Sequence, residues 1–230
     1  MVQLELKNLS IGYNYKPVQK NINCKIEYGD FVCVIGTNGV GKSTLIKTIL
    51  GLVSPISGKI LYDKRTKLSS IGYLQQSLSI DSDFPASVYE VVLSGCLSMI
   101  KNKPFYGKKE REIVKRNLEL LDIENIKSKS FKELSGGQQQ RVLIARAMCA
   151  ANKMIILDEP FVGLDVYMVK QLKNTIHRIN KELGVTIVMV THHLDLSIED
   201  VTKVLELSST GAYFGNVKEY QNHKKAREEC

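Results

Sequence analysis

The chain has 230 residues, of which 43% are hydrophobic, and a formal net charge of +8. This length suits one globular unit with a subdomain, and the apolar share is enough for a core. No apolar run approaches the ~18 residues of a membrane span, and residues 1–5 lack a signal-peptide pattern. The five cysteines are scattered without a C-x-x-C pair, which favours reduced thiols over a disulfide or metal framework. We therefore expect a cytosolic chain.

The predicted strands are of two kinds. Residues 2–6 and 22–26 alternate apolar and polar side chains, which is typical of half-buried antiparallel strands. Residues 31–35, 154–157 and 185–190 are continuous apolar runs, as expected of central parallel strands. The fold class is therefore α/β, with a parallel core and a small antiparallel β subdomain.

Helices are predicted between and after the central strands. Apolar residues at spacings of three and four share one helical face over the segment 166–183. They are Val166, Val169, Leu172, Ile176, Ile179 and Leu183. Residues 77–135 have helical patterns and no central-strand run, which predicts an all-helical insertion, and the polar segment from Asn216 predicts a helical or frayed tail.

A glycine-rich loop follows the apolar run 31–35 and opens a helical run at 44–50. In such a setting successive backbone N–H groups point at phosphate oxygens, and the helix adds the positive end of its dipole. Lys42 is placed to reach the β- and γ-phosphates, and the Ser43 hydroxyl to bind Mg²⁺. The predicted nucleotide-binding residues here are Gly36, Thr37, Asn38, Gly39, Val40, Gly41, Lys42, Ser43 and Thr44.

A second motif, Leu-Ser-Gly-Gly-Gln at residues 134–138, precedes another helical run. Ser135 can cap that helix, and Gly136 and Gly137 allow a ligand to approach its N–H groups closely. We therefore predict a second anion site, which includes Gln138. With both motifs present, the chain resembles the ATP-binding cassette (ABC) ATPase family over nearly all of its length. The resemblance implies a P-loop NTPase core of the ABC type, with ATP and Mg²⁺ as its cofactors.

The resemblance also implies roles for residues at the ends of strands. The apolar strand 155–157 leads into Asp158 and Glu159, as in a Walker B motif. Asp158 is then a Mg²⁺ ligand and Glu159 the general base. Gln76 matches the Q-loop glutamine, a Mg²⁺ ligand and catalytic residue, although Gln75 leaves its register open.

Further positions match the family pattern. His192 corresponds to the switch histidine, with His193 as the alternative, and joins Glu159, Lys42 and Gln76 in the predicted catalytic set. Asp165 lies in a segment similar to the D-loop, which crosses a dimer interface. Tyr13 resembles the aromatic residue that stacks on adenine, and Tyr15 is the competing assignment.

The family resemblance implies a head-to-tail homodimer in which two ATP molecules are each sandwiched between a phosphate loop and the partner's signature motif. The core would be residues 1–76 and 153–230, and the helical signature subdomain residues 77–152. The motor would act on a separate integral membrane permease, from the cytoplasmic face of the membrane as a peripheral subunit. An extracytoplasmic substrate-binding protein is expected in the full system.

Residues 83–93 look like the corresponding segment of manganese and zinc importers, so import of a divalent metal ion is expected. Siderophore and cobalamin importers share parts of this pattern, and an exporter would keep the same chemistry. A soluble ABC ATPase acting on nucleic acid or ribosomes is the rival from another class, supported by the net charge. We expect no nucleic-acid partner, because the chain has neither a second cassette nor a coiled-coil insertion.

Overall fold

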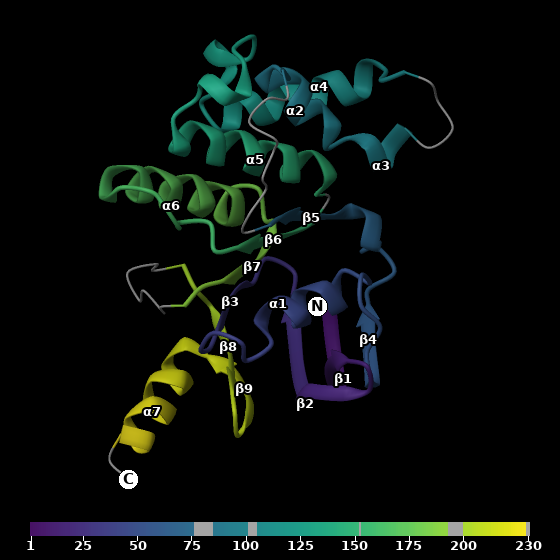
Figure 1. Ribbon diagram of the computed structural model, residues 1–230, viewed down its shortest axis with the longest axis vertical. Coiled ribbons are helices and arrows are strands. Elements are labelled where there is room, and N and C mark those ends of the chain that lie inside the picture. The colour runs from purple at the N-terminus through teal and green to yellow at the C-terminus, as the bar shows by residue number, and fades with distance from the viewer. Residues whose placement is uncertain (76–84, 101–104, 152, 193–199, 229–230) are drawn as a thin grey trace. The chain divides into compact units, whose positions relative to one another are not determined.

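The computed structural model describes residues 1–75, 85–100, 105–151, 153–192 and 200–228 (Figure 1). The chain forms two compact units, which are Met1–Leu68 with Gly184–Cys230, and Ser69–Leu183. Among the described residues, no helix combines the length and apolarity needed to cross a bilayer. Each unit carries part of the predicted site.

A three-stranded antiparallel sheet lies in the first unit. Its strands are β1 (Val2–Tyr13), β2 (Lys16–Glu27) and β4 (Ser57–Tyr62), in the order β2-β1-β4. The two segments predicted as antiparallel strands are parts of β1 and β2, so that prediction is confirmed. Asn14 and Tyr15 join them with φ angles of 49° and 60°, the left-handed pair that matches the twist of a two-residue hairpin.

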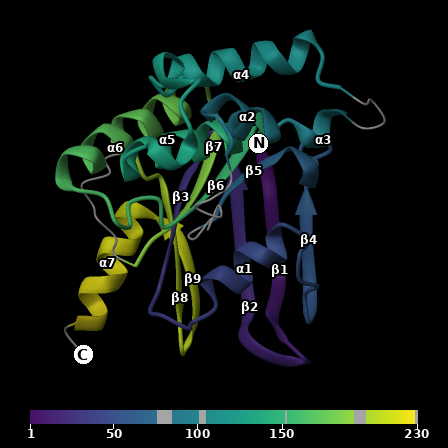
Figure 2. The ribbon, with the colours of Figure 1, turned by 45° about the horizontal axis from the view of Figure 1, so that its top comes forward.

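The first unit also holds the parallel strands that position the phosphate loop. β3 (Phe31–Ile35) is fully buried and pairs in parallel with β7 (Thr186–Val190) and β8 (Lys203–Ser208). β9 (Gly211–Asn216) closes a hairpin with β8 and lies beside β2 (Figure 2). Two helices belong here, α1 (Lys42–Ile49) after β3 and α7 (Val217–Glu228) after β9. The parallel pairing of two predicted apolar strands is thereby confirmed.

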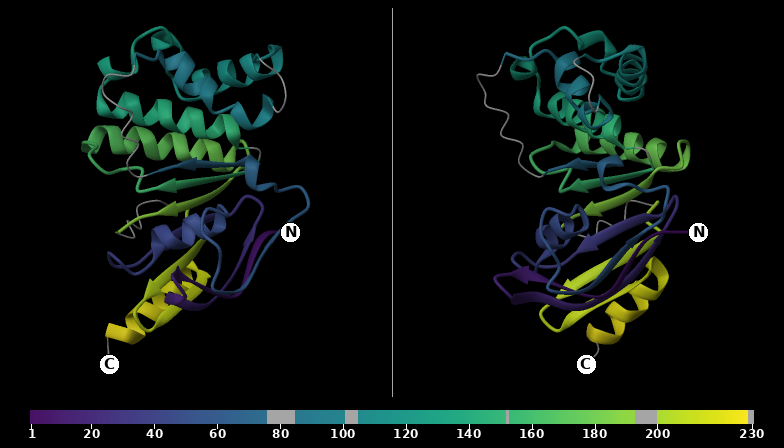
Figure 3. Two further views of the ribbon diagram at one scale, coloured as in Figure 1. Left: turned by 45° about the vertical axis from the view of Figure 1, so that its right-hand side comes forward. Right: turned by 90° about the vertical axis from the view of Figure 1, so that its right-hand side faces the viewer.

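The second unit combines a parallel strand pair with helices. β5 (Ile71–Leu74) pairs with β6 (Met154–Asp158), and α5 (Gly136–Ala150) packs against β5. Figures 1 and 3 show α5 and α6 (Val166–Lys181) side by side. The remaining helical elements are α2 (Val88–Ser94), α3 (Leu97–Ile100), α4 (Lys108–Leu120) and the short 3₁₀ turns η2 (Glu124–Ile126) and η3 (Phe131–Glu133). A further 3₁₀ turn, η1 (Leu68–Ser70), begins on the last residue of the first unit's segment Met1–Leu68.

The predicted helical insertion is confirmed over its described parts. Residues 85–100 and 105–135 contain helices and 3₁₀ turns, and their one β-type pairing is the isolated bridge between Ser87 and Ser130. The apolar stripe predicted on α6 is shorter than its periodicity indicates. Leu172, Ile176 and Ile179 are buried, but Val166 is 88% exposed and Leu183 is 45% exposed. Val166 occupies the first turn of the helix and Leu183 lies beyond its end, so neither reaches the packed middle.

Candidate nucleotide-binding site

The loop between β3 and α1 has a backbone that requires glycine. Gly36, Gly39 and Gly41 have φ angles of 148°, 78° and 110°, in a region that side chains disfavour. Gly36 has a second reason to be glycine, because a Cβ there would lie 2.3 Å from the carbonyl oxygen of Leu207 on β8. The loop therefore curls against β8 before α1 begins at Lys42.

The Lys42 side chain folds back into this loop. It is 6% exposed, and its Nζ donates hydrogen bonds to the carbonyl oxygens of Gly36 (2.7 Å) and Thr37 (3.0 Å). The same Nζ lies 3.4 Å from Nδ1 of His192, which follows β7. The structure thus brings together two residues that the sequence places 150 positions apart. Ser43, in the first turn of α1, is exposed.

A cavity of about 910 Å³ opens beside the first half of the loop. Residues 36–38 and His192 line one part of it, and Glu206 of β8 with Tyr220 and Lys224 of α7 line another. Sequence reasoning identified the loop and His192 but none of the residues from β8 or α7. Those residues carry no motif, and only the fold places them beside the loop.

The two candidate tyrosines for adenine stacking lie on the β1–β2 hairpin. Tyr13 ends β1 and is 49% exposed, whereas Tyr15 lies in the turn and is 93% exposed. Stacking needs an accessible aromatic face, which both residues offer. Tyr13 has less exposed surface to bury against a base than Tyr15 has. Its backbone is held in place by strand pairing with Lys16.

The signature segment forms a capped helix start in the second unit. The Ser135 hydroxyl accepts the N–H of Gln138 at 3.4 Å, and the Gln138 side chain accepts the N–H of Ser135 at 3.1 Å. This reciprocal capping box confirms the predicted cap. Gly136 is open, since a Cβ there would meet no atom within 4 Å, whereas one at Gly137 would lie 2.2 Å from Sδ of Met168. The start of α5 is therefore accessible at Gly136 and packed at Gly137.

Two buried carboxylates lie at the end of β6, Asp158 as its last residue and Glu159 directly after it. Asp158 is 3% exposed and Glu159 is 8% exposed, and Glu159 has a φ of 52°, a conformation that costs ~1 kcal/mol in a residue with a side chain. Strain of this kind is common at functional sites. The side-chain amide of Gln140 on α5 donates to the carbonyl of Pro160 at 2.9 Å. The signature helix is therefore tied to the turn that carries Glu159.

Tyr73 of β5 is a neighbour of this site that sequence reasoning missed. Its hydroxyl donates to Oδ2 of Asp158 at 3.4 Å. Burial, with the nearby Asp158 carboxylate, raises the pKa of Tyr73 to about 12, so the phenol stays protonated and keeps its donor. Tyr73 lies opposite Ile156 in the β5–β6 register, two residues before Asp158. A prediction of this strand pairing would therefore have placed Tyr73 near Asp158.

The structure describes some of the remaining predicted positions and leaves out others. Asp165 is the N-cap of α6, where its carboxylate accepts the N–H of Met168 at 2.9 Å. Gln76 and the alternative switch residue His193 lie outside the described residues. Gln75, which left the register of the Q-loop glutamine open, directly follows β5 and is exposed.

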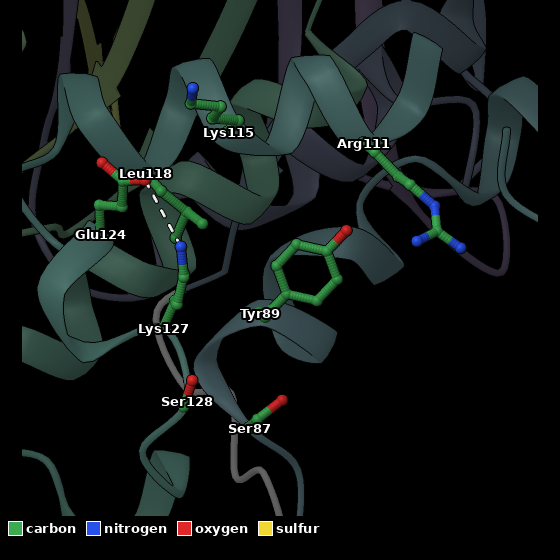
Figure 4. A pocket seen from close by; sticks show the side chains of 8 residues that line it. All are labelled: Ser87, Tyr89, Arg111, Lys115, Leu118, Glu124, Lys127 and Ser128. Atoms are coloured by element: carbon green, nitrogen blue, oxygen red, sulfur yellow. Dashed lines mark ion pairs between the residues drawn. The ribbon is translucent and has the colours of Figure 1, made fainter. Parts of the chain in front are cut away.

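A separate hollow of about 650 Å³ lies on the helical part of the second unit (Figure 4). It is lined by Ser87, Tyr89, Arg111, Lys115, Leu118, Glu124, Lys127 and Ser128. Lys127 forms an ion pair with Glu124 at 3.5 Å, and Lys115 forms one with Glu119 at 3.7 Å. The hollow contains none of the predicted site residues, and its basic side chains are partly neutralised.

A glycine loop between a buried parallel strand and a helix, with a lysine folded into it, defines a P-loop nucleotide-binding protein. The family model of the ABC transporter matches residues 19–162. The chain is 37% identical to the manganese transport system ATP-binding protein MntB of Bacillus subtilis, over 94% of this chain and 87% of that protein. It is 35% identical to the zinc uptake system ATP-binding protein ZurA of Listeria innocua, over 98% of this chain and 90% of that protein.

Two solved structures agree with these relatives. The structure of cbiO1 from Clostridium perfringens, part of the ABC transporter complex cbiONQ, matches with a TM-score of 0.82 and 33% identity, over 99% of this chain and 94% of that one. The dimeric post-hydrolysis state of an ATP-binding cassette bound to ADP and Pi matches with a TM-score of 0.74 and 26% identity, over 93% and 98%. The chain belongs to the ABC transporter family and is an ATP-hydrolysing transporter subunit. ATPases of this family bind nucleotide, dimerise and act with a membrane permease.

Proposed function

We propose that this chain hydrolyses ATP in a head-to-tail homodimer, with each ATP held between the phosphate loop of one copy and residues 135–138 of the other. The observation that carries the proposal is the open, capped start of α5 at Gly136. A helix N-terminus of this kind can hold an anion, on a chain that already has a phosphate loop. A γ-phosphate neutralised by both surfaces joins two copies. Its loss on hydrolysis removes the bridge and opens the dimer.

Within each site we assign the binding roles as follows. Lys42 contacts the β- and γ-phosphates, and Tyr13 stacks on adenine. Asp165 contributes to the contact between the copies. The backbone N–H groups of the loop 36–44 and of the α5 start hold the phosphates.

The metal-binding and catalytic roles fall to other residues. Ser43, Gln76 and Asp158 hold Mg²⁺, which supplies positive charge against the phosphates. The exposed hydroxyl of Ser43 and the buried carboxylate of Asp158 are the hard oxygen ligands that Mg²⁺ prefers. Glu159 activates the attacking water as general base, and His192 contacts the γ-phosphate.

The proposed function also includes a membrane partner and a transported ion. The chain drives a separate integral membrane permease from the cytoplasmic face, in a system with an extracytoplasmic substrate-binding protein. The cargo is a divalent metal ion, manganese or zinc. The similarity to MntB of a manganese transport system and ZurA of a zinc uptake system, together with the resemblance of residues 83–93, supports this cargo.

The Glu159→Gln variant tests the dimer and the general base together. It should bind ATP, form a dimer at equilibrium and turn over at least ~100-fold more slowly, since general-base catalysis contributes ~10²–10⁴-fold. Size-exclusion chromatography with light scattering and a phosphate-release assay measure the two properties. The matched control is Glu159→Gln combined with Lys42→Ala, which should stay monomeric with ATP. Rapid turnover by Glu159→Gln would contradict the assigned base.

A pull-down tests the membrane partner. Glu159→Gln protein with ATP and Mg²⁺ should recover a multi-span membrane protein from detergent-solubilised membranes. Recovery of ribosomes or nucleic acid instead would support a non-transport ABC ATPase and leave the ATPase assignment intact. Uptake of labelled manganese and zinc in cells that lack the chain, with and without the wild-type copy, tests the cargo. Normal uptake of both ions without the chain would exclude them.

A further inference from the structure

Gln19 on β2 is a buried polar residue that belongs to none of the predicted nucleotide-binding motifs. It is 5% exposed. Its side-chain amide nitrogen donates to the carbonyl oxygen of Val40 at 3.0 Å and to that of Ser208 at 2.8 Å. Both amide hydrogens are thereby used, as expected of a buried donor. The first acceptor lies in the phosphate loop, and the second is the last residue of β8.

These hydrogen bonds hold the second half of the loop at Val40. A separate contact, at Gly36, holds its first half. Gly36 packs against the carbonyl of Leu207, one residue before Ser208. Gly41 lies against the same part of β2, since a Cβ there would be 3.4 Å from Cγ of Gln19 and 3.1 Å from Cγ1 of Val18. The loop is therefore packed between β2 and the end of β8.

The direction of the Val40 carbonyl has a consequence for the next amide. The described peptide bonds are trans, and in a planar trans peptide the C=O and the following N–H point in opposite directions. When Gln19 holds the Val40 oxygen toward β2, the N–H of Gly41 must point away from β2. Gly41 is the residue that caps α1, so this N–H belongs to the group of amides that phosphate-binding loops present to their ligand.

We propose that Gln19 is a positioning residue for ATP binding, which sets the orientation of the Val40–Gly41 peptide through its two hydrogen bonds. The inference rests on the phosphate loop as the ATP site but on neither the dimer nor the transported ion. Gln19 touches no phosphate itself. Its loss should raise the Kd for ATP and the KM, and should change kcat less, because the catalytic carboxylates belong to another part of the chain.

The test compares two Gln19 variants. Gln19→Leu keeps a similar volume without donors, and Gln19→Glu keeps the shape but places a carboxylate against two carbonyl oxygens. We expect each to raise the Kd for ATP roughly 10-fold, which equals ~1.4 kcal/mol. Titration of a fluorescent ATP analogue gives the Kd, and steady-state kinetics give KM and kcat. Faster hydrogen exchange at the Gly41 amide is the second expected readout.

Gln3 provides the matched control. It lies on β1 of the same sheet, is 0% exposed, and its side-chain oxygen accepts a hydrogen bond from the Thr186 hydroxyl. Gln3→Leu therefore removes a buried amide from the same unit without touching the loop. It should lower the melting temperature but leave the Kd for ATP unchanged. An equal rise in Kd for Gln3→Leu and Gln19→Leu would overturn the proposal, because general destabilisation would then explain both.

Lys42→Ala, measured in parallel, separates the assignment of the phosphate loop from the role of Gln19. If Lys42→Ala loses ATP affinity while both Gln19 variants bind normally, Gln19 has no positioning role and the loop assignment stands. If Lys42→Ala binds ATP normally, the loop itself is wrongly assigned and the Gln19 proposal fails with it. If Gln19→Leu does not fold, the Gln19→Glu variant carries the same comparison.

Discussion

At the scale of single residues, the contacts of the Lys42 ammonium imply that ATP binding at the proposed site is an exchange of hydrogen bonds. Its protons already go to the carbonyls of Gly36 and Thr37, with the His192 ring nearby. Phosphate oxygens must compete with these acceptors. The net free energy from Lys42 is therefore smaller than that of a new charge-assisted bond, and movement of the lysine also changes the surroundings of His192.

The two hairpin tyrosines can be separated by substitution. We expect Tyr13→Ala to weaken ATP binding about 10-fold, since stacking of a base on an aromatic side chain is worth ~1–3 kcal/mol. Tyr15→Ala is the matched control and should leave the affinity unchanged. Calorimetric titration of both variants measures this difference. The opposite pattern would assign adenine stacking to Tyr15.

The residues that sequence reasoning missed share a physical feature. Gln19 and Tyr73 act through partners that are distant in sequence, and the Gln19–Ser208 bond joins residues 189 positions apart. Glycine loops and strand-end carboxylates have local patterns, so Lys42 and Asp158 could be found from the sequence. A glutamine in an alternating strand has no such pattern, because its role depends on which carbonyl the fold brings beside it.

At the scale of elements, the capped start of α5 can be compared with another helix of the same unit. Ser135 and Ser87 both form capping boxes, at α5 and α2. Ser135→Ala and Ser87→Ala should each cost ~1 kcal/mol of stability. Only Ser135→Ala should also weaken ATP-driven dimerisation in the Glu159→Gln background. Denaturant unfolding and light scattering measure these effects, and equal loss of dimer in both variants would contradict a direct role for Ser135.

Gly137 leads to a steric prediction about the contact between α5 and α6. A Cβ at Gly137 would meet Sδ of Met168, so Gly137→Ala should destabilise the protein by roughly 1–3 kcal/mol. Gly137→Ala combined with Met168→Ala should recover part of that loss, measured as a shift in the urea midpoint. Gly136→Ala is the control, since it meets no atom and should unfold as the wild type does. Additive losses in the double variant would argue against this contact.

Element prediction succeeded for the strands that are buried on both faces and failed for two strands that have no buried residue. β3 and β7 are buried along their whole length and were evident as apolar runs. β4 and β9 have half-buried or exposed residues throughout, so their sequences lack the pattern of a strand. Hydrogen bonding to β1 and β8 defines these two strands, and composition does not record that pairing.

At the scale of the whole molecule, the phosphate loop and the signature helix belong to different compact units. In dilute Glu159→Gln protein, ATP should slow hydrogen exchange in the loop 36–44 and leave the start of α5 unchanged. At concentrations that give the dimer, the first turn of α5 should be protected as well. Exchange measured by mass spectrometry at two protein concentrations tests this. Protection of α5 that is independent of concentration would contradict a site shared between copies.

The hydrogen bond from Gln140 to the carbonyl of Pro160 has a consequence for timing in the proposed dimer. Each α5 contacts the ATP bound to the partner, while the turn after Glu159 serves the ATP of its own copy. In that dimer the hydrogen bond couples each active site to the occupancy of the other. The two hydrolysis events then become interdependent, and the rate should rise with ATP concentration more steeply than a hyperbola.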